Sequence, residues 1–308
     1  MAKNILIIGG SYFVGKVFVE LLLEKGGFNI YIVNRGNAPL NHQGVTEIVC
    51  DRHDYNLKEA VPDLSYEAVV DFCAYSALDI AQLMIALSER TVNQFIFIST
   101  VSVYEDSLDL PVREDWPKLT GPQPGLGPAA DYGYNKWQAE LKLTDLCKKS
   151  GMAFTVLRPV IIYGKYNYAP RESYFFDLIL KNETIVLPKN NLPLFQFVSV
   201  WDVAELIYLC LGHEAVLNRA FNLAGEELIS YERLIEVMRE ITGSSFNTQL
   251  MGNNEIDEQR IPLPFPLDRH LVYSGTLISR LTGFSYTSFV DGMRKTWEWY
   301  KKTKEENL

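Results

Sequence analysis

The feature that most constrains the fold is a set of three elements at the N-terminus: an apolar run, a glycine-rich turn and an amphipathic helix. The run Asn4–Ile8 leads into the turn Gly9–Gly15, and apolar residues then recur at helical spacing over residues 14–22. Gly9 allows a tight turn, and Gly15 lets the helix pack closely on the strand. Unpaired N–H groups at a helix N-terminus favour a phosphate. This order predicts a turn that binds the pyrophosphate of a dinucleotide.

The alternation of strand and helix continues along the chain. Short runs rich in Ile and Val are separated by segments with helical period until about residue 165. Strands that alternate with helices pair in parallel through right-handed crossovers. We therefore predict an α/β fold, with a doubly wound parallel Rossmann sheet and a smaller α/β C-terminal substrate lobe. The predicted strands are 4–8, 29–33, 47–50, 68–71, 94–99 and 155–159.

Composition excludes several classes of function. The 308 residues are 47% hydrophobic and 22% charged, as in a globular protein, and the net charge of −9 disfavours nucleic acid as a partner. No run reaches the roughly 18 apolar residues of a membrane helix, and the first apolar run is too short for a signal peptide, so we expect a cytoplasmic protein. Isolated cysteines, without histidines at metal-ligand spacing, predict neither disulfides nor a metal site. These cysteines are Cys50, Cys73, Cys147 and Cys210.

Two places in the N-terminal part bear on which dinucleotide binds. Tyr12 stands where the usual glycine-rich pattern has its middle glycine, so its side chain is expected to crowd the approach of phosphate to the backbone. The second strand ends at Asn34 and Arg35, where NAD-binding folds usually place an acid for the ribose 2′-hydroxyl. Arg35 either meets the 2′-phosphate of NADP or is simply solvated. We predict NAD or NADP, with a slight preference for NADP.

A tyrosine and a lysine provide a candidate acid/base pair. Tyr132 and Lys136 are four residues apart, and they share one face of a helix if the helix begins there. This spacing also arises by chance. The pair gains weight because it follows the run Phe97–Tyr104, which brings hydroxyl groups, Thr100 among them, to the carboxyl edge of the sheet. A tyrosine with a pKa near 10 becomes a usable acid or base when an adjacent ammonium favours its phenolate.

With these residues, the chain resembles the extended short-chain dehydrogenase/reductases, the NAD-dependent epimerase/dehydratase group. The resemblance implies that Tyr132 is the acid/base, that Lys136 binds the nicotinamide ribose and lowers the pKa of the tyrosine, and that Thr100 hydrogen-bonds the reacting oxygen. The altered glycine-rich turn, with Asn34–Gly36 and Asp51-Arg52, is similar to an atypical branch that includes the chloroplast stem-loop binding proteins. Further segments that carry the resemblance are Arg158–Gly164, Phe197–Ala204, Phe221–Gly225 and Gly292–Tyr300.

The resemblance and the alternation together predict the domains and the cofactor site. We expect a Rossmann domain over 1–165, rejoined by a strand and a helix within about 196–213, and a substrate-binding lobe made of 166–195 and 214–308. Ligands of such sheets bind at the carboxyl ends of the strands. The residues expected at the cofactor are Gly9, Ser11, Tyr12, Phe13, Val14, Gly15, Asn34, Arg35, Asp51, Arg52, Cys73, Ala74, Tyr75, Ser99, Tyr132, Lys136, Pro159 and Val160.

The predicted function is an NAD(P)-dependent epimerase or reductase that acts on a sugar-like hydroxyl or ketone by hydride transfer, with Tyr132 as acid/base. Dehydration is disfavoured, because Val101-Ser102 follows Thr100 where the family's 4,6-dehydratases have Asp-Glu. A nucleotide sugar is one candidate substrate, although Val160–Ile162 stands where nucleotide-sugar enzymes commonly carry asparagine. The alternative is a cofactor-binding, non-catalytic or RNA-associated protein of the atypical branch. The expected partner is a small-molecule substrate, without metal or membrane, and a homodimer is left open.

Overall fold

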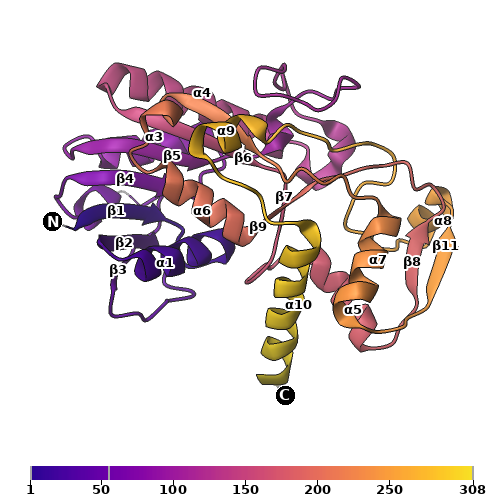
Figure 1. Cartoon of the computed structure of the whole chain (residues 1–308). Helices are drawn as coiled ribbons and strands as arrows, with labels where there is room; N and C mark the ends of the chain where they lie inside the picture. Colours follow the sequence, from indigo (N-terminus) through magenta and orange to yellow (C-terminus); the bar gives the residue numbers. More distant parts are fainter. Residues whose placement is uncertain (1, 55, 307–308) are drawn as a thin grey trace.

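The central element is a seven-stranded, wholly parallel sheet with the strand order β10-β6-β5-β4-β1-β2-β3. It is seen in a computed structural model that describes residues 2–54 and 56–306 (Figure 1). All six predicted strands are present, and the prediction of a doubly wound α/β fold is confirmed. The strands are β1 (Lys3–Ile8), β2 (Phe28–Asn34), β3 (Val45–Val49), β4 (Tyr66–Asp71), β5 (Val92–Ile98), β6 (Ala153–Pro159) and β10 (Arg219–Leu223).

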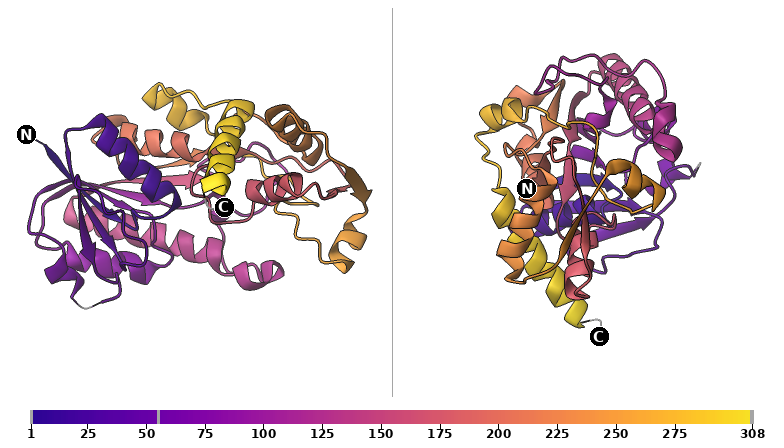
Figure 2. Two further views of the ribbon diagram at one scale, coloured as in Figure 1. Left: turned by 90° about the horizontal axis from the view of Figure 1, so that it is seen from below. Right: turned by 90° about the vertical axis from the view of Figure 1, so that its right-hand side faces the viewer.

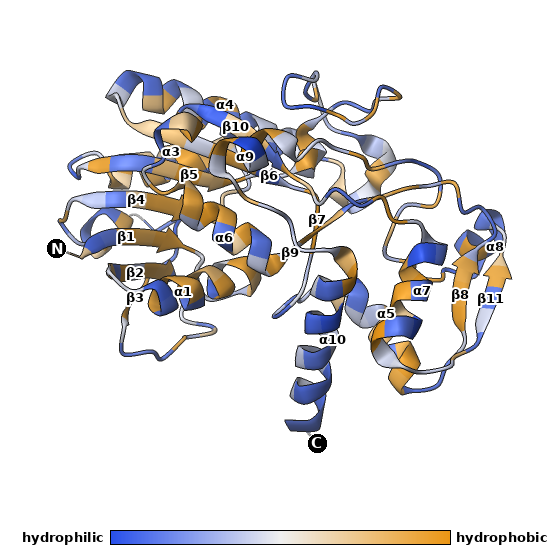
Figure 3. Ribbon diagram, viewed as in Figure 1, coloured by the Kyte–Doolittle hydropathy of each residue, from blue (hydrophilic) through white to orange (hydrophobic). Residues whose placement is uncertain are grey.

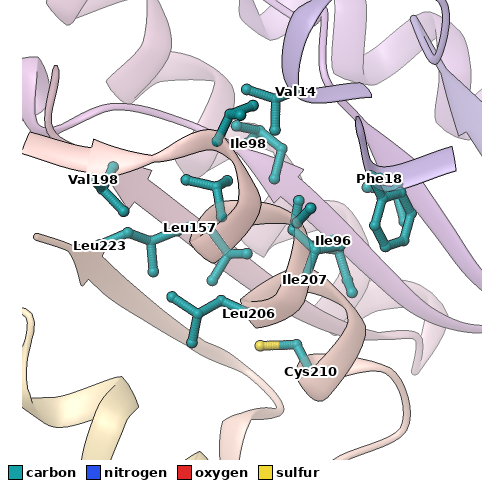
Figure 4. Close-up of a cluster of buried hydrophobic side chains, with 14 of the residues drawn as sticks. Val14, Phe18, Ile96, Ile98, Leu157, Val198, Leu206, Ile207, Cys210 and Leu223 are labelled. Atoms are coloured by element: carbon teal, nitrogen blue, oxygen red, sulfur yellow. The ribbon is translucent and has the colours of Figure 1, made fainter. Parts of the chain in front are cut away.

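Helices cover both faces of this sheet. On one face α1 and α6 pack side by side, and on the other α3 packs against α4 and the short α2. These helices are α1 (Phe13–Lys25), α2 (Leu57–Ala60), α3 (Ala77–Ala86), α4 (Tyr132–Ser150) and α6 (Val200–Cys210). Apolar side chains fill the space between the first pair of helices and the sheet. Those drawn in Figure 4 include Val14, Phe18, Ile96, Ile98, Leu157, Leu206, Ile207 and Cys210.

A second lobe lies beyond the carboxyl ends of the strands (Figures 1 and 2). Its core is rich in aromatic residues, among them Phe175, Phe195 and Phe265, whose rings lie 5.0–6.2 Å apart by their centroids where they meet. Two parallel strands, β8 (Ile185–Pro188) and β11 (Thr248–Met251), edge this lobe. Its helices are α5 (Glu172–Leu180), α7 (Tyr231–Thr242), α8 (Asn253–Glu258) and α10 (Phe289–Glu306).

The division of the chain between the lobes differs from the sequence prediction in two respects. β9 (Phe197–Ser199) does not enter the central sheet, because it pairs with β7 (Ile161–Tyr163) in a separate two-stranded sheet. Only α6 of the predicted 196–213 segment covers the Rossmann sheet. β10, predicted in the substrate lobe of 214–308, is the edge strand beside β6. Its apolar residues Phe221 and Leu223 are fully buried there, but a five-residue strand between irregular stretches shows no alternation in the sequence.

A small helix from the C-terminal part of the chain also packs on the Rossmann side, as β10 does. α9 (Thr276–Thr282) packs on β10 and α6, and its Ile278 belongs to the core of the Rossmann side. The chain therefore passes repeatedly between the lobes. Hydrophobic residues concentrate in the strands and the inner helix faces, whereas α10 is largely hydrophilic (Figure 3). No helix in the described part of the chain combines the length and the apolar character that a bilayer crossing requires.

Candidate active site

A cavity of about 880 Å³ opens at the carboxyl ends of the central strands. Its walls come from the glycine-rich turn, from the ends of β2 to β6 and from segments of the second lobe. In open α/β sheets this is where ligands bind. All the residues predicted at the cofactor and the substrate line this cavity, with the exception of Ala74, which is fully buried. Two residues that the motifs do not indicate, Tyr168 and Arg171, also line it.

The glycine-rich turn has the shape that a pyrophosphate requires. Gly9 has a φ of +86°, and a Cβ on Gly15 would lie 2.5 Å from the carbonyl oxygen of Gly9, so only glycine fits at the start of α1. The first turn of α1 contains no acidic residue, which leaves its positive N-terminal end facing the cavity. The residues present therefore fit the pyrophosphate of a dinucleotide.

The turn accommodates the tyrosine in place of its middle glycine. Tyr12 has an extended backbone with φ of −127° and ψ of 147°, and its side chain is 54% exposed. The left-handed conformation falls instead on Phe13, whose φ is +37°. A non-glycine residue in this region is strained, and such strain concentrates at ligand sites. Tyr12 itself therefore has an ordinary backbone conformation at the cavity wall, and the strained residue of the turn is Phe13.

At the end of β2, the side chain of Asn34 is hydrogen-bonded within the protein, whereas that of Arg35 has no ion-pair partner among the described residues. Asn34 accepts a hydrogen bond from the backbone N–H of Gly36 at 2.8 Å, and its amide donates to Glu47 at 3.0 Å. Arg35 is exposed, lines the cavity and, among the described residues, has no carboxylate within ion-pair distance. Its guanidinium therefore lines the cavity without a carboxylate partner in the described part of the chain.

Arg52 lies at the cavity wall, but its guanidinium is used internally. It makes two 2.9 Å hydrogen bonds to the carboxylate of Asp71, and it also donates to the carbonyl of Asp79 and to the sulfur of Cys73. These bonds join the end of β4 to the start of α3. Burial raises the pKa of the Cys73 thiol to about 12, so the thiol stays protonated at neutral pH.

Lys136 is held at the floor of the cavity by backbone carbonyls. α4 begins at Tyr132, so Tyr132 and Lys136 lie four residues apart on one helix and share a face of it. The ammonium of Lys136 donates to the carbonyls of Ala74 at 2.7 Å and Ile98 at 2.8 Å, at the ends of β4 and β5. Ala74 thus supports the site through its carbonyl. Burial lowers the pKa of Lys136 to about 8.

Opposing effects act on the pKa of the Tyr132 phenol. Desolvation in the cavity raises the pKa of Tyr132, while a hydrogen bond with Thr100 and the positive charge of Arg171 act in the opposite direction. The ring of Tyr75 lies 6.3 Å away by centroids. The Lys136 ammonium donates to the two carbonyls described above, and its effect on the pKa of Tyr132 stays a prediction.

A buried polar network fixes the loop that carries Thr100. Arg158 pairs with Glu140 at 2.5 Å, both side chains being 3% exposed, and Ser99 donates to Glu140 at 2.5 Å. Arg158 also donates to the hydroxyl of Tyr104, which in turn donates to Asn222. The network joins β5, β6, β10 and α4 beneath the cavity, so Arg158 of the family segment has a supporting role.

Tyr168 and Arg171 come from the segment between β7 and α5. They follow the Arg158–Gly164 segment, which contains β7. Ligands of such sheets bind beyond the ends of strands, so recognising β7 as a strand would have indicated both residues. In the described part of the chain, no group of three or more acidic, histidine or cysteine side chains is placed to hold a metal ion.

Comparisons with known proteins agree with this geometry. Residues 5–224 match the NAD dependent epimerase/dehydratase family. The chloroplast stem-loop binding protein of 41 kDa b of Arabidopsis thaliana is 26% identical over 78% of this chain, which spans 64% of that protein's length. The UDP-glucose 4-epimerase of Corynebacterium glutamicum is 25% identical over 78% of this chain and 80% of its own.

Solved structures show the same fold. The UDP-N-acetylglucosamine 4-epimerase of Methanobrevibacter ruminantium superposes with a TM-score of 0.80 at 20% identity, over 98% of this chain and 99% of that one. The UDP-glucuronic acid 4-epimerase of Bacillus cereus, solved with UDP-glucuronic acid and NAD, superposes with a TM-score of 0.79 at 17% identity, over 97% of this chain and 99% of that one. The family match covers well over half of the chain, and the predictions of this family and of an enzyme are confirmed. The protein is an enzyme of the NAD dependent epimerase/dehydratase family.

Proposed function

We propose that the protein is an NAD(P)-dependent epimerase that acts on the sugar hydroxyl of a nucleotide sugar. The observation that carries this proposal is that the glycine-rich turn, Thr100, Tyr132 and Lys136 line one cavity. Several relatives that match most of the chain are epimerases of UDP-sugars. Dehydration is not proposed, because the apolar Val101 lies at the cavity where a dehydratase needs an acid.

The glycine-rich turn and the ends of β2 and β3 would hold the dinucleotide. Its pyrophosphate would lie against Gly9–Gly15 at the N-terminus of α1, and Arg35 would meet a 2′-phosphate, which favours NADP. The nicotinamide supplies the hydride acceptor and donor when the cofactor is bound. Lys136, already directed by the carbonyls of Ala74 and Ile98, would donate to the nicotinamide ribose.

Tyr132 would move the proton at its phenol oxygen. Thr100 would donate a hydrogen bond to the same substrate oxygen and orient it toward Tyr132. Because desolvation raises the pKa of Tyr132, the phenol is protonated at neutral pH and suits the acid role. The base role needs a nearby positive charge, and Arg171 is one cation whose charge acts on Tyr132.

The test is an assay of UDP-glucose, UDP-N-acetylglucosamine and UDP-glucuronic acid with either cofactor, with products identified by NMR. Stereochemistry must be followed, because an epimerase regenerates its cofactor and leaves absorbance unchanged. Tyr132→Phe should lower turnover by about 10²- to 10⁴-fold. Tyr134→Phe, on the same helix but outside the cavity, should leave turnover unchanged. Turnover that survives both Tyr132→Phe and Lys136→Ala would refute the mechanism.

One observation favours a second candidate, an RNA-associated protein. The Arabidopsis relative is named for stem-loop binding, although the net charge of −9 of this chain opposes contact with a phosphate backbone. Gel-shift titration with stem-loop RNA at two salt concentrations distinguishes the two. Tight binding with no turnover of any nucleotide sugar would support the RNA function.

A further inference from the structure

The segment 164–171, which we call the strap, leaves β7 and crosses α1 before α5 begins. Glu20 of α1 accepts hydrogen bonds from the ammonium of Lys165 at 3.0 and 3.2 Å and from the hydroxyl of Tyr166 at 2.7 Å. The ring of Tyr166 also lies 4.1 Å from the ammonium of Lys16. The first half of the strap is therefore tied to the helix that starts at the glycine-rich turn.

The second half of the strap is fixed from inside the other lobe. Glu172, which is 2% exposed, accepts hydrogen bonds from the backbone N–H of Gly164 at 2.9 Å and from the side-chain amide of Asn167 at 2.9 and 3.1 Å. Tyr168 then packs edge-on against Phe13, with ring centroids 6.1 Å apart. The strap thereby holds Tyr168 beside the glycine-rich turn, where its side chain lines the cavity and is 75% exposed.

Arg171, at the end of the strap, presents a positive charge to the same cavity. One of its guanidinium N–H groups donates to the carbonyl of Ile162 at 3.1 Å. No carboxylate of the described residues lies within ion-pair distance, and the neighbouring Glu172 is already engaged by Gly164 and Asn167. Asp51 is the one acid among the described residues that line the cavity, and it lies at the end of β3, where it accepts from the backbone N–H of His53.

Tyr168 and Arg171 line the same cavity as Tyr132, Thr100 and Lys136. Desolvation raises the pKa of Tyr132, the positive charge of Arg171 lowers it, and Tyr168 is near enough to act on it as well. Tyr168 acts in the same way on Tyr75, whose ring contacts Tyr132. A hydroxyl and a cation that has no carboxylate partner among the described residues therefore line the cavity that holds Tyr132.

We infer that Tyr168 and Arg171 form the substrate-binding wall opposite Tyr132, and that Arg171 pairs with a carboxylate on the reacting part of the substrate. The inference rests on the proposed function, since Tyr132 marks the reacting end. A guanidinium with several free donors matches the two oxygens of a carboxylate, whereas a neutral hydroxyl leaves its charge uncompensated. The diphosphate of a nucleotide is the other source of anionic oxygens, so the experiment separates the two.

The protein loaded with its reduced cofactor is titrated by calorimetry with UDP, UDP-glucose and UDP-glucuronic acid. UDP-glucuronic acid should bind about tenfold more tightly than UDP-glucose, because a hydrogen bond to a charged group contributes about 1.5 kcal/mol or more. Arg171→Gln should abolish this difference and leave the affinity for UDP unchanged. Arg113→Gln, an exposed arginine outside the cavity, is the matched control.

Two results would overturn the assignment of Arg171. One is that the wild type binds UDP-glucose and UDP-glucuronic acid with equal affinity. The other is that Arg171→Gln loses affinity for UDP, UDP-glucose and UDP-glucuronic acid to the same extent, which would assign the guanidinium to the diphosphate. Tyr168→Phe should lower the affinity for both UDP-sugars by about fivefold and leave the affinity for UDP unchanged. Unchanged affinities in this variant would remove Tyr168 from the wall.

A nucleotide-free measurement separates this inference from the proposed function. Phenylglyoxal labels accessible arginines, and mass spectrometry of the peptide that contains Arg171 reports its rate of labelling. D-glucuronate should slow the labelling and D-glucose should not. If no UDP compound binds but D-glucuronate still protects, the nucleotide-sugar function fails and the wall stands. If neither sugar protects in that case, the wall is refuted.

Discussion

The two walls of the cavity differ in how their polar side chains are used. On the Rossmann side, Asn34, Arg52 and Lys136 all have hydrogen-bond partners within the protein. On the strap side, Tyr168 is largely exposed, and Arg171 donates to a single carbonyl. The first wall is preorganised by the fold and suits a group common to the whole family. The second wall leaves its hydrogen-bonding capacity for a ligand, which is where specificity can differ between relatives.

The largest expected effect tests how rigid the Rossmann side is. Arg158→Met would leave Glu140 as an uncompensated buried charge and should lower the free energy of unfolding by about 3–5 kcal/mol, measured by urea denaturation. Arg233→Met removes an exposed pair with Glu236 and should cost under about 1 kcal/mol. Similar values for the two variants would show that the buried network does not support this wall.

A smaller effect is expected at the start of α1. The Cβ of Gly15→Ala would meet the backbone of Gly9 at 2.5 Å, so the turn must open, at a cost of about 1–3 kcal/mol in unfolding free energy, with loss of dinucleotide binding. Gly125→Ala, where a Cβ meets nothing within 4 Å, is the control. Calorimetric titration with NADPH and NADH reads the binding. Full affinity in Gly15→Ala would contradict a preorganised pyrophosphate site.

Arg35 is the exception on the Rossmann side, because its guanidinium is exposed. If it binds a 2′-phosphate, Arg35→Ala should lower the affinity for NADPH by about tenfold, because a charged hydrogen bond is lost, and leave the affinity for NADH unchanged. Arg113→Ala controls for a loss of net charge. A wild type that prefers NADH, with no change in Arg35→Ala, would remove the preference for NADP.

The smallest effect concerns the buried ammonium. Burial lowers the pKa of Lys136 from 10.5 to about 8, so between these values the unfolded chain binds more protons than the folded one. Lys136 therefore opposes folding fully below about pH 8, and this penalty declines as the pH rises toward 10.5. The unfolding free energy of the wild type, relative to Lys136→Met, should rise by about 1 kcal/mol from pH 8 to 9. A flat difference would place the pKa of Lys136 near its ordinary value.

Periodicity and motif predicted most of the fold, because strands buried on both faces must be apolar throughout. Periodicity did not predict β10, because Arg219–Leu223 is a short edge strand far along the chain from its neighbour β6. The residues that the motifs assign to the cofactor, with the exception of Ala74, line one cavity, since strand ends lie together by topology. The pairing of Arg52 with Asp71 and the support of Lys136 by the Ala74 carbonyl depend on side-chain directions that spacing does not encode. Tyr168 was missed because β7 has only three residues.

The repeated passage of the chain between the lobes has a consequence for how substrate preference can change. Because α6, β10 and α9 of the Rossmann side interrupt the second lobe in sequence, that lobe is not a contiguous cassette that recombination could exchange. The strap is different, since the eight residues 164–171 form one uninterrupted stretch with both ends anchored. A new preference can therefore arise by exchanging a loop while both folded halves keep their residues.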